Sequence, residues 1–291
     1  MQYRSLGPWG PDVSAIGYGG MHLSIVDRPD EATSIRVIHA ALDAGVTLLD
    51  TADVYCLHDG EIGHNERLMA RALREWQGPR DTVLIATKGG MTRPEGRWGR
   101  NGRPRHLRAA CERSLRALSV EAIELYQLHA PDPDVPFEES VGALADLLGE
   151  GKILRVGISN VTVEQIDAAR GIVPVTTVQN RLNPFFPEAR DEGVVAHCAA
   201  NRIGFLAYSP TGGGRLTKKL PGHPVVEAVA RRTGASPHAV VIAWVRAQGP
   251  TVIPIPGARK PEHAVDSARV ADFALAPADL EELDAAEFDR S

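Results

Sequence analysis

Eight short apolar runs, each followed by a segment with the apolar spacing of a helix, constrain this 291-residue chain more than any other feature. The runs are too short for helices, so each is expected to form a buried strand. Strands that alternate regularly with helices are typical of parallel α/β architectures, because the helix returns the chain to the same end of the sheet. The expected strands cover residues 15–19, 48–50, 83–87, 123–129, 153–159, 175–179, 203–209 and 251–254.

The intervening segments carry helix-start signals. Asp30 is placed to cap the first helix, and Ser236-Pro237 opens a later one with a capping serine and a proline at the first helical position. Eight such units favour a (β/α)₈ TIM barrel, with a short hairpin or plug at residues 3–13 and two helices after the eighth strand. A doubly wound sheet is less favoured, because no Gly-x-Gly-x-x-Gly turn follows a strand. No linker divides the chain, so residues 1–291 are expected to form one barrel domain.

Composition excludes several classes of partner. A net charge of -5 gives no reason to expect nucleic acid or an anionic membrane. No apolar run reaches the roughly 20 residues that span a bilayer, and the first residues lack the apolar core of a signal peptide. Cys56, Cys111 and Cys198 are odd in number and scattered, which favours a reduced, cytoplasmic protein. Cys56 is more simply an incidental loop cysteine than a reactive thiol.

The segment 58–64 offers side chains of the types that bind metals, namely His58, Asp59, Glu61 and His64. Nothing elsewhere in the chain completes a ligand set, so a solvated loop is favoured and no metal is expected.

Polar residues stand where three of the expected strands end. Asp50, Lys88 and His129 close the second, third and fourth strands, and Tyr55 follows Asp50 in the next loop. Active sites of such barrels lie at the carboxyl ends of the strands, so these side chains are expected on one rim. A buried lysine needs a partner, and Asp50 is the available carboxylate. Taken singly, His129 and Tyr55 are more simply structural residues, and Asp50 with Lys88 is equally compatible with a purely structural buried pair.

The same four residues suit proton transfer. A cation such as Lys88 beside the phenol of Tyr55 is expected to lower its pKa from about 10. That arrangement suits donation of a proton to a carbonyl oxygen that becomes negative, and His129 is placed to hydrogen-bond the same oxygen.

In their order along the chain these residues resemble the aldo-keto reductases. Each motif is weak alone, but the combination is specific and runs over nearly the whole chain. The resemblance implies reversible hydride transfer between a nicotinamide and an aldehyde or ketone. Tyr55 would be the general acid, tuned by Lys88; Asp50 would pair with Lys88, and His129 would orient the carbonyl. The matching motifs are Asp50-Thr51-Ala52 with Tyr55, Thr87-Lys88, Gln127-Leu128-His129, Gly157-Ile158-Ser159-Asn160, Val178-Gln179-Asn180, Tyr208-Ser209-Pro210 and Ile255-Pro256-Gly257-Ala258-Arg259.

The resemblance also implies a dinucleotide site, with NADPH favoured and NADH possible. Arg259 is expected at the adenosine 2′-phosphate, where its guanidinium can donate two hydrogen bonds. The family often has Arg, Gln or Asn where His263 and Ser267 stand here, and the loop at residues 211–221 is short. The implied contacts are Ser159, Asn160 and Gln179 for the carboxamide, Tyr208 beneath the nicotinamide, Ser209, Pro210, Thr211, Gly212 and Leu216 for the pyrophosphate, Gly20 and Met21 for the ribose, and Ile255, Gly257, Ala258, Arg259, His263 and Ser267 for the adenosine end.

A small-molecule carbonyl compound is the expected partner. The loop at residues 92–105 carries five arginines around Trp98. Trp98 is therefore a candidate substrate contact with Tyr55 and His129, and the arginines, Arg93 among them, are candidate contacts for an anionic or polyhydroxylated substrate. A solvated loop explains this segment equally well. Two other functions remain open: a module that senses redox state by binding nicotinamide nucleotide, and a lyase or aldolase using Lys88 as a Schiff-base nucleophile. Asp50 argues against the second, because it keeps the lysine charged.

Overall fold

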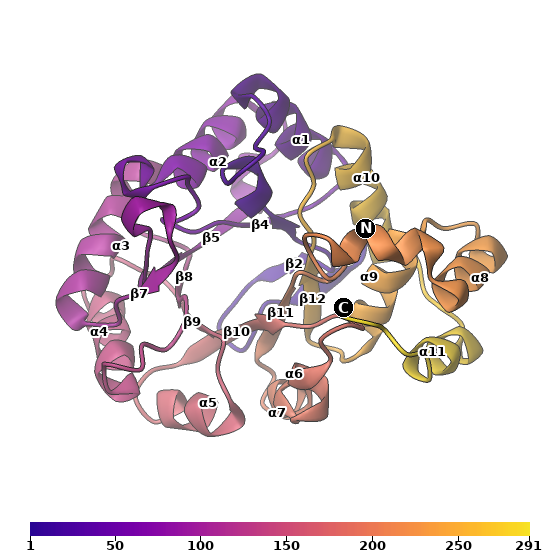
Figure 1. The fold of residues 1–291 in the computed structure, drawn as a ribbon. Coiled ribbons are helices and arrows are strands. Elements are labelled where there is room, and N and C mark those ends of the chain that lie inside the picture. Colours follow the sequence, from indigo (N-terminus) through magenta and orange to yellow (C-terminus); the bar gives the residue numbers. More distant parts are fainter.

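The computed structural model describes residues 1–291, and its central feature is a sheet of eight parallel strands curled into a barrel (Figure 1). The backbone N–H groups of Gly17 and Gly19 donate to the carbonyls of Pro254 and Pro256, at 2.9 and 3.0 Å, and join the two edges. The expected (β/α)₈ barrel is therefore confirmed. Its strands are β3 (Tyr18–Gly19), β4 (Leu48–Asp50), β5 (Leu84–Gly89), β8 (Leu125–Leu128), β9 (Val156–Ser159), β10 (Val175–Arg181), β11 (Gly204–Tyr208) and β12 (Val252–Ile255).

Helices form a ring outside the barrel (Figure 1). The expected caps are present: Asp30 accepts a hydrogen bond from the Thr33 amide at 2.8 Å, and Ser236 Oγ accepts one from the Ala239 amide at 3.0 Å. The helices are α1 (Glu31–Asp43), α2 (His64–Glu75), α3 (Pro104–Leu118), α4 (Phe137–Gly149), α5 (Val163–Arg170), α6 (Glu188–Asp191), α7 (Val194–Ala200), α8 (Pro224–Thr233), α9 (Pro237–Ala247), α10 (Pro261–Arg269) and α11 (Pro277–Asp284).

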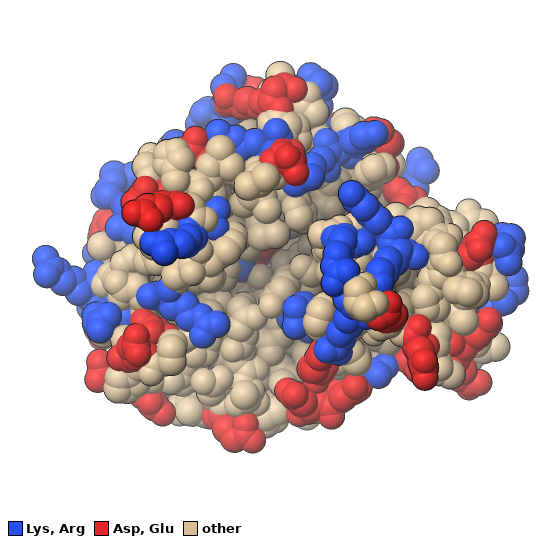
Figure 2. Space-filling view, viewed as in Figure 1, with Lys and Arg blue, Asp and Glu red and all other residues tan.

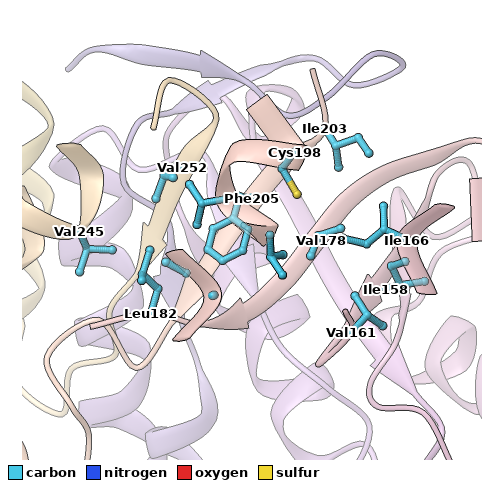
Figure 3. Packing of buried hydrophobic residues seen from close by; sticks show 14 of the residues in the cluster. Ile158, Val161, Ile166, Val178, Leu182, Cys198, Ile203, Phe205, Val245 and Val252 are labelled. Carbon is cyan, nitrogen blue, oxygen red and sulfur yellow. The ribbon is translucent and has the colours of Figure 1, made fainter. Parts of the chain in front are cut away.

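The main hydrophobic core lies between the barrel wall and the helices. In the part drawn in Figure 3, Val178 and Phe205 of the wall lie among Ile166 of α5, Cys198 of α7 and Val245 of α9. These side chains are buried, and removing their apolar surface from water is the main stabilising contribution. A second apolar layer fills the lower barrel interior and consists of Leu6, Val13, Leu48, Leu84, Ala86, Leu125, Leu206, Ile253 and Ile255.

The amino-terminal end of the barrel is closed by an antiparallel hairpin, β1 (Tyr3–Ser5) with β2 (Asp12–Ser14), which we call the plug. Leu6 is fully buried there, and a Cβ at Gly204 would lie 1.9 Å from the Leu6 carbonyl oxygen, so only glycine fits. Arg4 donates to the carbonyls of Arg246 and Gly249 at 3.1 and 3.0 Å. The hairpin expected from residues 3–13 is thus confirmed.

Residues 92–105, expected as an open loop, are partly ordered as a second hairpin. It pairs β6 (Met91–Thr92) with β7 (Gly99–Arg100) and leads directly into α3. Its strands are two residues long and lack apolar alternation, which explains why the sequence pattern did not indicate them. None of the helices has the length and apolar character needed to cross a bilayer.

Candidate active site

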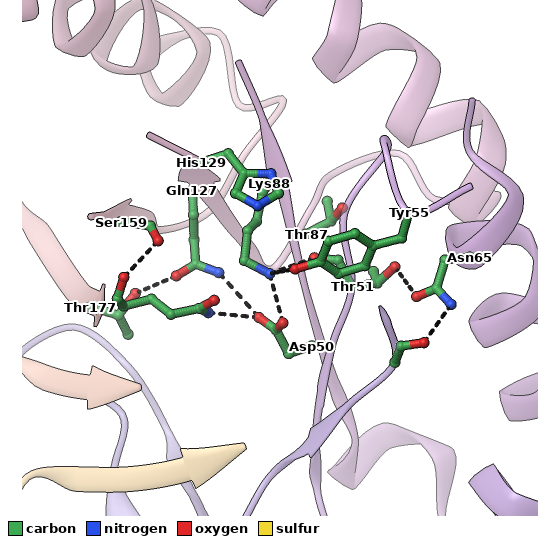
Figure 4. Close-up of polar contacts among 12 residues, drawn as sticks. Asp50, Thr51, Tyr55, Asn65, Thr87, Lys88, Gln127, His129, Ser159 and Thr177 are labelled. Atoms are coloured by element: carbon green, nitrogen blue, oxygen red, sulfur yellow. Dashed lines mark hydrogen bonds and ion pairs between the residues drawn. The ribbon is translucent and has the colours of Figure 1, made fainter. Parts of the chain in front are cut away.

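The carboxyl ends of the strands surround an opening, here called the mouth. In the space-filling view the molecule is hollowed at this point, and Lys and Arg side chains gather beside the hollow (Figure 2). A polar layer lies above the apolar interior, and Figure 4 shows its side chains converging from β4, β5, β8, β9 and β10. Barrels of this class place their reactive groups at this end.

Lys88, at the end of β5, is the centre of the polar layer. Its side chain is fully buried, and its Nζ contacts Asp50 Oδ2 at 2.6 Å, the Thr51 carbonyl at 2.8 Å and the Tyr55 hydroxyl at 3.3 Å (Figure 4). Three acceptors around one nitrogen fit an ammonium ion with its three protons. The ion pair expected between Asp50 and Lys88 is therefore present, and Tyr55 joins it.

The second oxygen of Asp50 is held by side-chain amides. Gln179 Nε2 donates to Asp50 Oδ1 at 2.8 Å, and Gln127 Nε2 lies 3.5 Å from the same oxygen. Thr177 Oγ1 in turn donates to Gln127 Oε1 at 3.4 Å. The carboxylate is thus fixed from three strands, which suits a buried charge that must keep one orientation.

Tyr55 remains protonated at neutral pH. Burial raises the pKa of its phenol well above 10, and the negative charge of Asp50 raises it further. The expectation that Lys88 would lower this pKa was wrong: burial and the charge of Asp50 disfavour the phenolate more than Lys88 favours it. A protonated phenol is nevertheless the form that a proton donor needs.

His129 meets Tyr55 edge to face, with ring centroids 5.7 Å apart and an interplanar angle of 82°. Burial and the charge of Lys88 hold the pKa of His129 well below 6.5, so the ring is neutral. Nδ1 is buried without a hydrogen-bond partner. A proton on Nδ1 would be unsatisfied there, so we assign the ring proton to Nε2, which can donate to a substrate oxygen.

The residues expected at the carboxamide are brought to the same rim. Tyr208 Oη donates to Asn160 Oδ1 at 2.8 Å, Asn160 Nδ2 donates to the His129 carbonyl at 2.9 Å, and Ser159 Oγ donates to the Gln179 carbonyl at 2.6 Å. Tyr208 is partly exposed at the end of β11, which leaves ring surface for stacking. These contacts make a continuous polar edge from Tyr208 to His129.

The loop after β11 is rich in left-handed backbone. Ser209 has φ 49°, and Gly212, Gly213 and Gly214 have φ 92°, 68° and 50°. A Cβ at Gly212 would lie 2.8 Å from the Phe185 ring, whereas nothing lies within 4 Å of one at Gly214. Glycine therefore lets this loop turn tightly while its backbone stays open to a ligand, which fits a pyrophosphate.

The loop after β3 and the segment after β12 lie side by side, as expected for one binding surface. A Cβ at Gly257 would lie 2.9 Å from the Gly19 carbonyl oxygen. Arg259 Nη2 donates to the Val26 carbonyl at 2.9 Å and Nε to the His22 carbonyl at 3.3 Å. Arg259 thus anchors the loop after β3, and its Nη1 keeps its protons available.

The remaining expected cofactor residues occupy different parts of this rim. Met21, expected at the ribose, packs against the cluster of Ala52, Val54 and Tyr55. His263 is exposed and Ser267 half-buried on α10. The left-handed loop and the partly exposed ring of Tyr208 are the features that best fit a bound dinucleotide.

The β6–β7 hairpin forms one wall beside Tyr55. Trp98 is 48% exposed, and the Arg93 guanidinium lies 4.0 Å above its ring. Arg93 itself is buried and donates to the carbonyls of Cys56 and Leu57, at 3.0 and 3.3 Å. It therefore ties the hairpin to the loop that carries Tyr55 and is not free to bind substrate.

Cys56 lies on the same loop and is buried. Burial raises the pKa of its thiol to about 11, and its Sγ donates to the Val54 carbonyl at 3.3 Å. A thiol with a raised pKa is a poor nucleophile, so an incidental loop cysteine is the better interpretation.

Two of the four side chains that suggested a metal, Glu61 and His64, have other partners. Arg28 donates to both oxygens of Glu61, at 2.8 and 3.0 Å, and His64 Nδ1 lies 2.8 Å from Ser24 Oγ. No group of three or more His, Cys, Asp or Glu side chains is arranged to hold a metal ion.

A second buried polar group lies behind the Tyr55 loop. Asp53 is fully buried with no hydrogen-bond partner for either oxygen, and Arg113 of α3 is 3.8 Å away. Burial and the neighbouring Glu66 raise the pKa of Asp53 well above 3.8. A cavity of about 340 Å³ adjoins it and is lined by Asp53, His106 and Arg113, among others.

The sequence motifs did not assign a role to Gln127. Gln127 lies on β8, two residues before His129, and side chains at that spacing share a face of a strand. The alternation was therefore a usable signal for placing Gln127 in the barrel interior.

Comparison with known proteins adds a second line of evidence. A model of the aldo/keto reductase family matches residues 15–287. A thermostable aldo-keto reductase in complex with the inhibitor epalrestat is 25% identical, with a TM-score of 0.81, over 98% of this chain and 99% of that one. The glycerol dehydrogenase from Gluconobacter oxydans is 30% identical, with a TM-score of 0.82, over 96% and 93%. An aldo/keto reductase from Klebsiella pneumoniae in complex with NADP and acetate is 26% identical, with a TM-score of 0.79, over 98% and 95%.

Proposed function

Because this chain belongs to the aldo/keto reductase family, and is on that ground an oxidoreductase, we propose that it reduces an aldehyde or ketone to the alcohol with NADPH. The observation that carries the proposal is the position of Lys88 Nζ, which bridges Asp50 Oδ2 at 2.6 Å and the Tyr55 hydroxyl at 3.3 Å. We propose further that residues 1–291 act as one barrel domain.

The reduced nicotinamide, when bound, supplies hydride to the carbonyl carbon. The residues of this chain manage the oxygen. Tyr55 donates its phenolic proton to the carbonyl oxygen, and Lys88 beside it stabilises the negative charge left on the phenol. Asp50 keeps Lys88 charged, and His129 Nε2 donates a hydrogen bond that orients the carbonyl.

The nucleotide would be held along the tops of β9 to β12. Ser159, Asn160 and Gln179 would meet the carboxamide and Tyr208 the ring face. The left-handed loop after Ser209 would enclose the pyrophosphate, with Gly20 and Met21 at the ribose and the Ile255–Arg259 segment at the adenosine end. A similar solved structure, that from Klebsiella pneumoniae, contains NADP, which supports the choice of nucleotide.

A Schiff-base function of Lys88 is less well supported. Its nitrogen is engaged by three acceptors within 3.3 Å and has no free lone pair as an ammonium.

Fluorescence titration of the purified protein with NADPH and NADH, followed by turnover of a reducible aldehyde, tests the proposal. We expect tighter binding of NADPH and oxidation of NADPH that depends on the aldehyde. Arg259→Ala should weaken NADPH far more than NADH. Loss of the contacts with the loop after β3 would affect both nucleotides alike, so equal losses would contradict the 2′-phosphate role. Binding of neither nucleotide would refute the oxidoreductase.

A further inference from the structure

Alternate side chains of strand β10 face the barrel interior, and successive ones lie nearer the mouth. Thr177 donates a hydrogen bond to Gln127 at 3.4 Å, and Gln179 donates one to Asp50 at 2.8 Å, so both side chains point into the barrel. Asn180 points the other way and bonds the backbone of Val161. Because side chains two apart share a face of a strand, Arg181 stands on the same face as Gln179, one layer nearer the mouth, at the exposed end of β10.

Arg181 is held in place without using its hydrogen-bond donors. It is paired in register with Tyr208 on β11, and its guanidinium carbon lies 3.5 Å from the centre of the Phe186 ring. Stacking on an aromatic face leaves the N–H groups at the edge of the guanidinium free to bind a ligand. The Arg181 charge is close enough to Tyr208 to lower the pKa of that phenol, against the larger effect of burial.

No protein group accepts a hydrogen bond from the Arg181 side chain or pairs with its charge. Arg181 is exposed, forms no side-chain hydrogen bond and has no carboxylate within 4.0 Å. Arg290, the other arginine stacked on Phe186, is different: it bonds Glu188 at 2.7 Å and also the Phe185 carbonyl. A planar fork of free donors beside the reaction site is suited to a carboxylate or a phosphate.

The order of the strands indicates which ligand carries that group. Around the barrel the sequence is β12, β11, β10, with Arg259 after β12 and the left-handed loop after β11. A nucleotide lying across these strands would have its nicotinamide on Tyr208 and its carboxamide at Ser159, Asn160 and Gln179, one layer below Arg181. Arg181 would therefore lie above the nicotinamide end, toward the opening through which the carbonyl compound enters, and away from the adenosine side.

We propose that Arg181 binds a carboxylate or phosphate of the carbonyl substrate, which makes this chain a reductase of anionic carbonyl compounds. The proposal rests on the proposed function and specifies its substrate class. The pyrophosphate of the nucleotide is a second source of the same anionic oxygens, and the experiment separates the two.

The test compares 4-formylbenzoate with its uncharged methyl ester, using wild-type protein, Arg181→Gln and the control Arg290→Gln. We expect Arg181→Gln to raise KM for 4-formylbenzoate by about 10- to 100-fold, the usual range for a charge-assisted hydrogen bond. KM for the ester and kcat for both substrates should change less than about twofold. Arg290→Gln should leave the preference for the anion intact, since its donors serve Glu188 and Phe185.

NADPH titration of the same variants separates the two sources of charge. If Arg181→Gln weakens NADPH binding and impairs both aldehydes equally, the guanidinium serves the pyrophosphate and the proposal is overturned. Equal kinetics of wild type and Arg181→Gln would overturn it too. Calorimetric binding of terephthalate to wild type and variant gives the comparison without turnover. If the protein reduced neither aldehyde, the proposed function would be refuted, and the binding of terephthalate would still test the role of Arg181.

Discussion

Among single residues, the chemistry depends on where three protons lie. Tyr55 keeps its phenolic proton because burial and Asp50 disfavour the phenolate. His129 lacks a second ring proton because burial and Lys88 disfavour the imidazolium. Lys88 keeps its charge because Asp50 and Thr51 accept from it, although burial lowers its pKa. Donor, orienting group and charge are therefore set before a substrate arrives.

Replacing Tyr55 with Phe removes only the proton donor, because the ring that meets His129 edge to face remains. We expect kcat for aldehyde reduction to fall by roughly 10²- to 10⁴-fold, the usual contribution of a positioned acid. The dissociation constant of NADPH should stay within about twofold. Tyr126→Phe is the matched control, since its buried hydroxyl has no partner. Near-normal turnover in Tyr55→Phe would exclude the assigned role.

The pH dependence of kcat follows from the same shifts. An ordinary histidine would give an inflection near pH 6.5, but the pKa of His129 lies well below that value, so the acid limb should appear only at lower pH. On the alkaline side Lys88 should lose its proton first, since burial lowers its pKa from 10.5 while that of Tyr55 is raised. Reduction rates measured across neutral pH should therefore form a plateau. An inflection near pH 6.5 that disappears in His129→Asn would contradict the assignment.

Among the elements, strands were easier to predict than what projects from them. The eight apolar runs predicted the barrel, and the polar residues that end them predicted the Asp50–Lys88 pair. Strand β10, however, runs two residues past the predicted end at residue 179, and that extension brings Arg181 to the mouth. Arg93 was a candidate for substrate binding, but the fold turns it inward onto Cys56 and Leu57. Composition shows that a charged side chain is present, but it does not show the direction in which that side chain points.

The carboxyl group of Asp53 is buried behind the barrel, beside α2 and α3. Its burial destabilises the folded protein. Its folded-state pKa is raised, so the folded protein binds a proton that the unfolded chain has lost above about pH 4. The free energy of unfolding should therefore fall as pH rises from the ordinary pKa of an aspartate to the raised pKa of Asp53. Asp53→Asn should flatten the dependence and raise the free energy of unfolding at pH 8, measured by urea denaturation at pH 5 and pH 8. The exposed Asp59→Asn at the same cavity is the control, and an unchanged slope in Asp53→Asn would contradict the argument.

Considered as a whole, the molecule divides its two tasks between the ends of one barrel. The amino-terminal end is filled with apolar side chains and tied by Arg4 to α9 and its following turn, which serves stability. The carboxyl end carries the proposed reactive groups and the loops after each strand. The alternation of strands and helices in the sequence was enough to predict this division, because it fixes which end each loop occupies. It could not predict the ligand, which depends on how individual side chains turn at the mouth.

The plug has a kinetic consequence. With the far end sealed, nucleotide and carbonyl compound would share the mouth as their entrance in the proposed function, and the nicotinamide would occupy the deeper place beside Tyr208. Binding should therefore follow a compulsory order, with NADPH first and NADP⁺ released last. In steady-state product inhibition, NADP⁺ should compete with NADPH and the alcohol should not. An alcohol that competes with NADPH would mean that the two ligands pass through that entrance in either order.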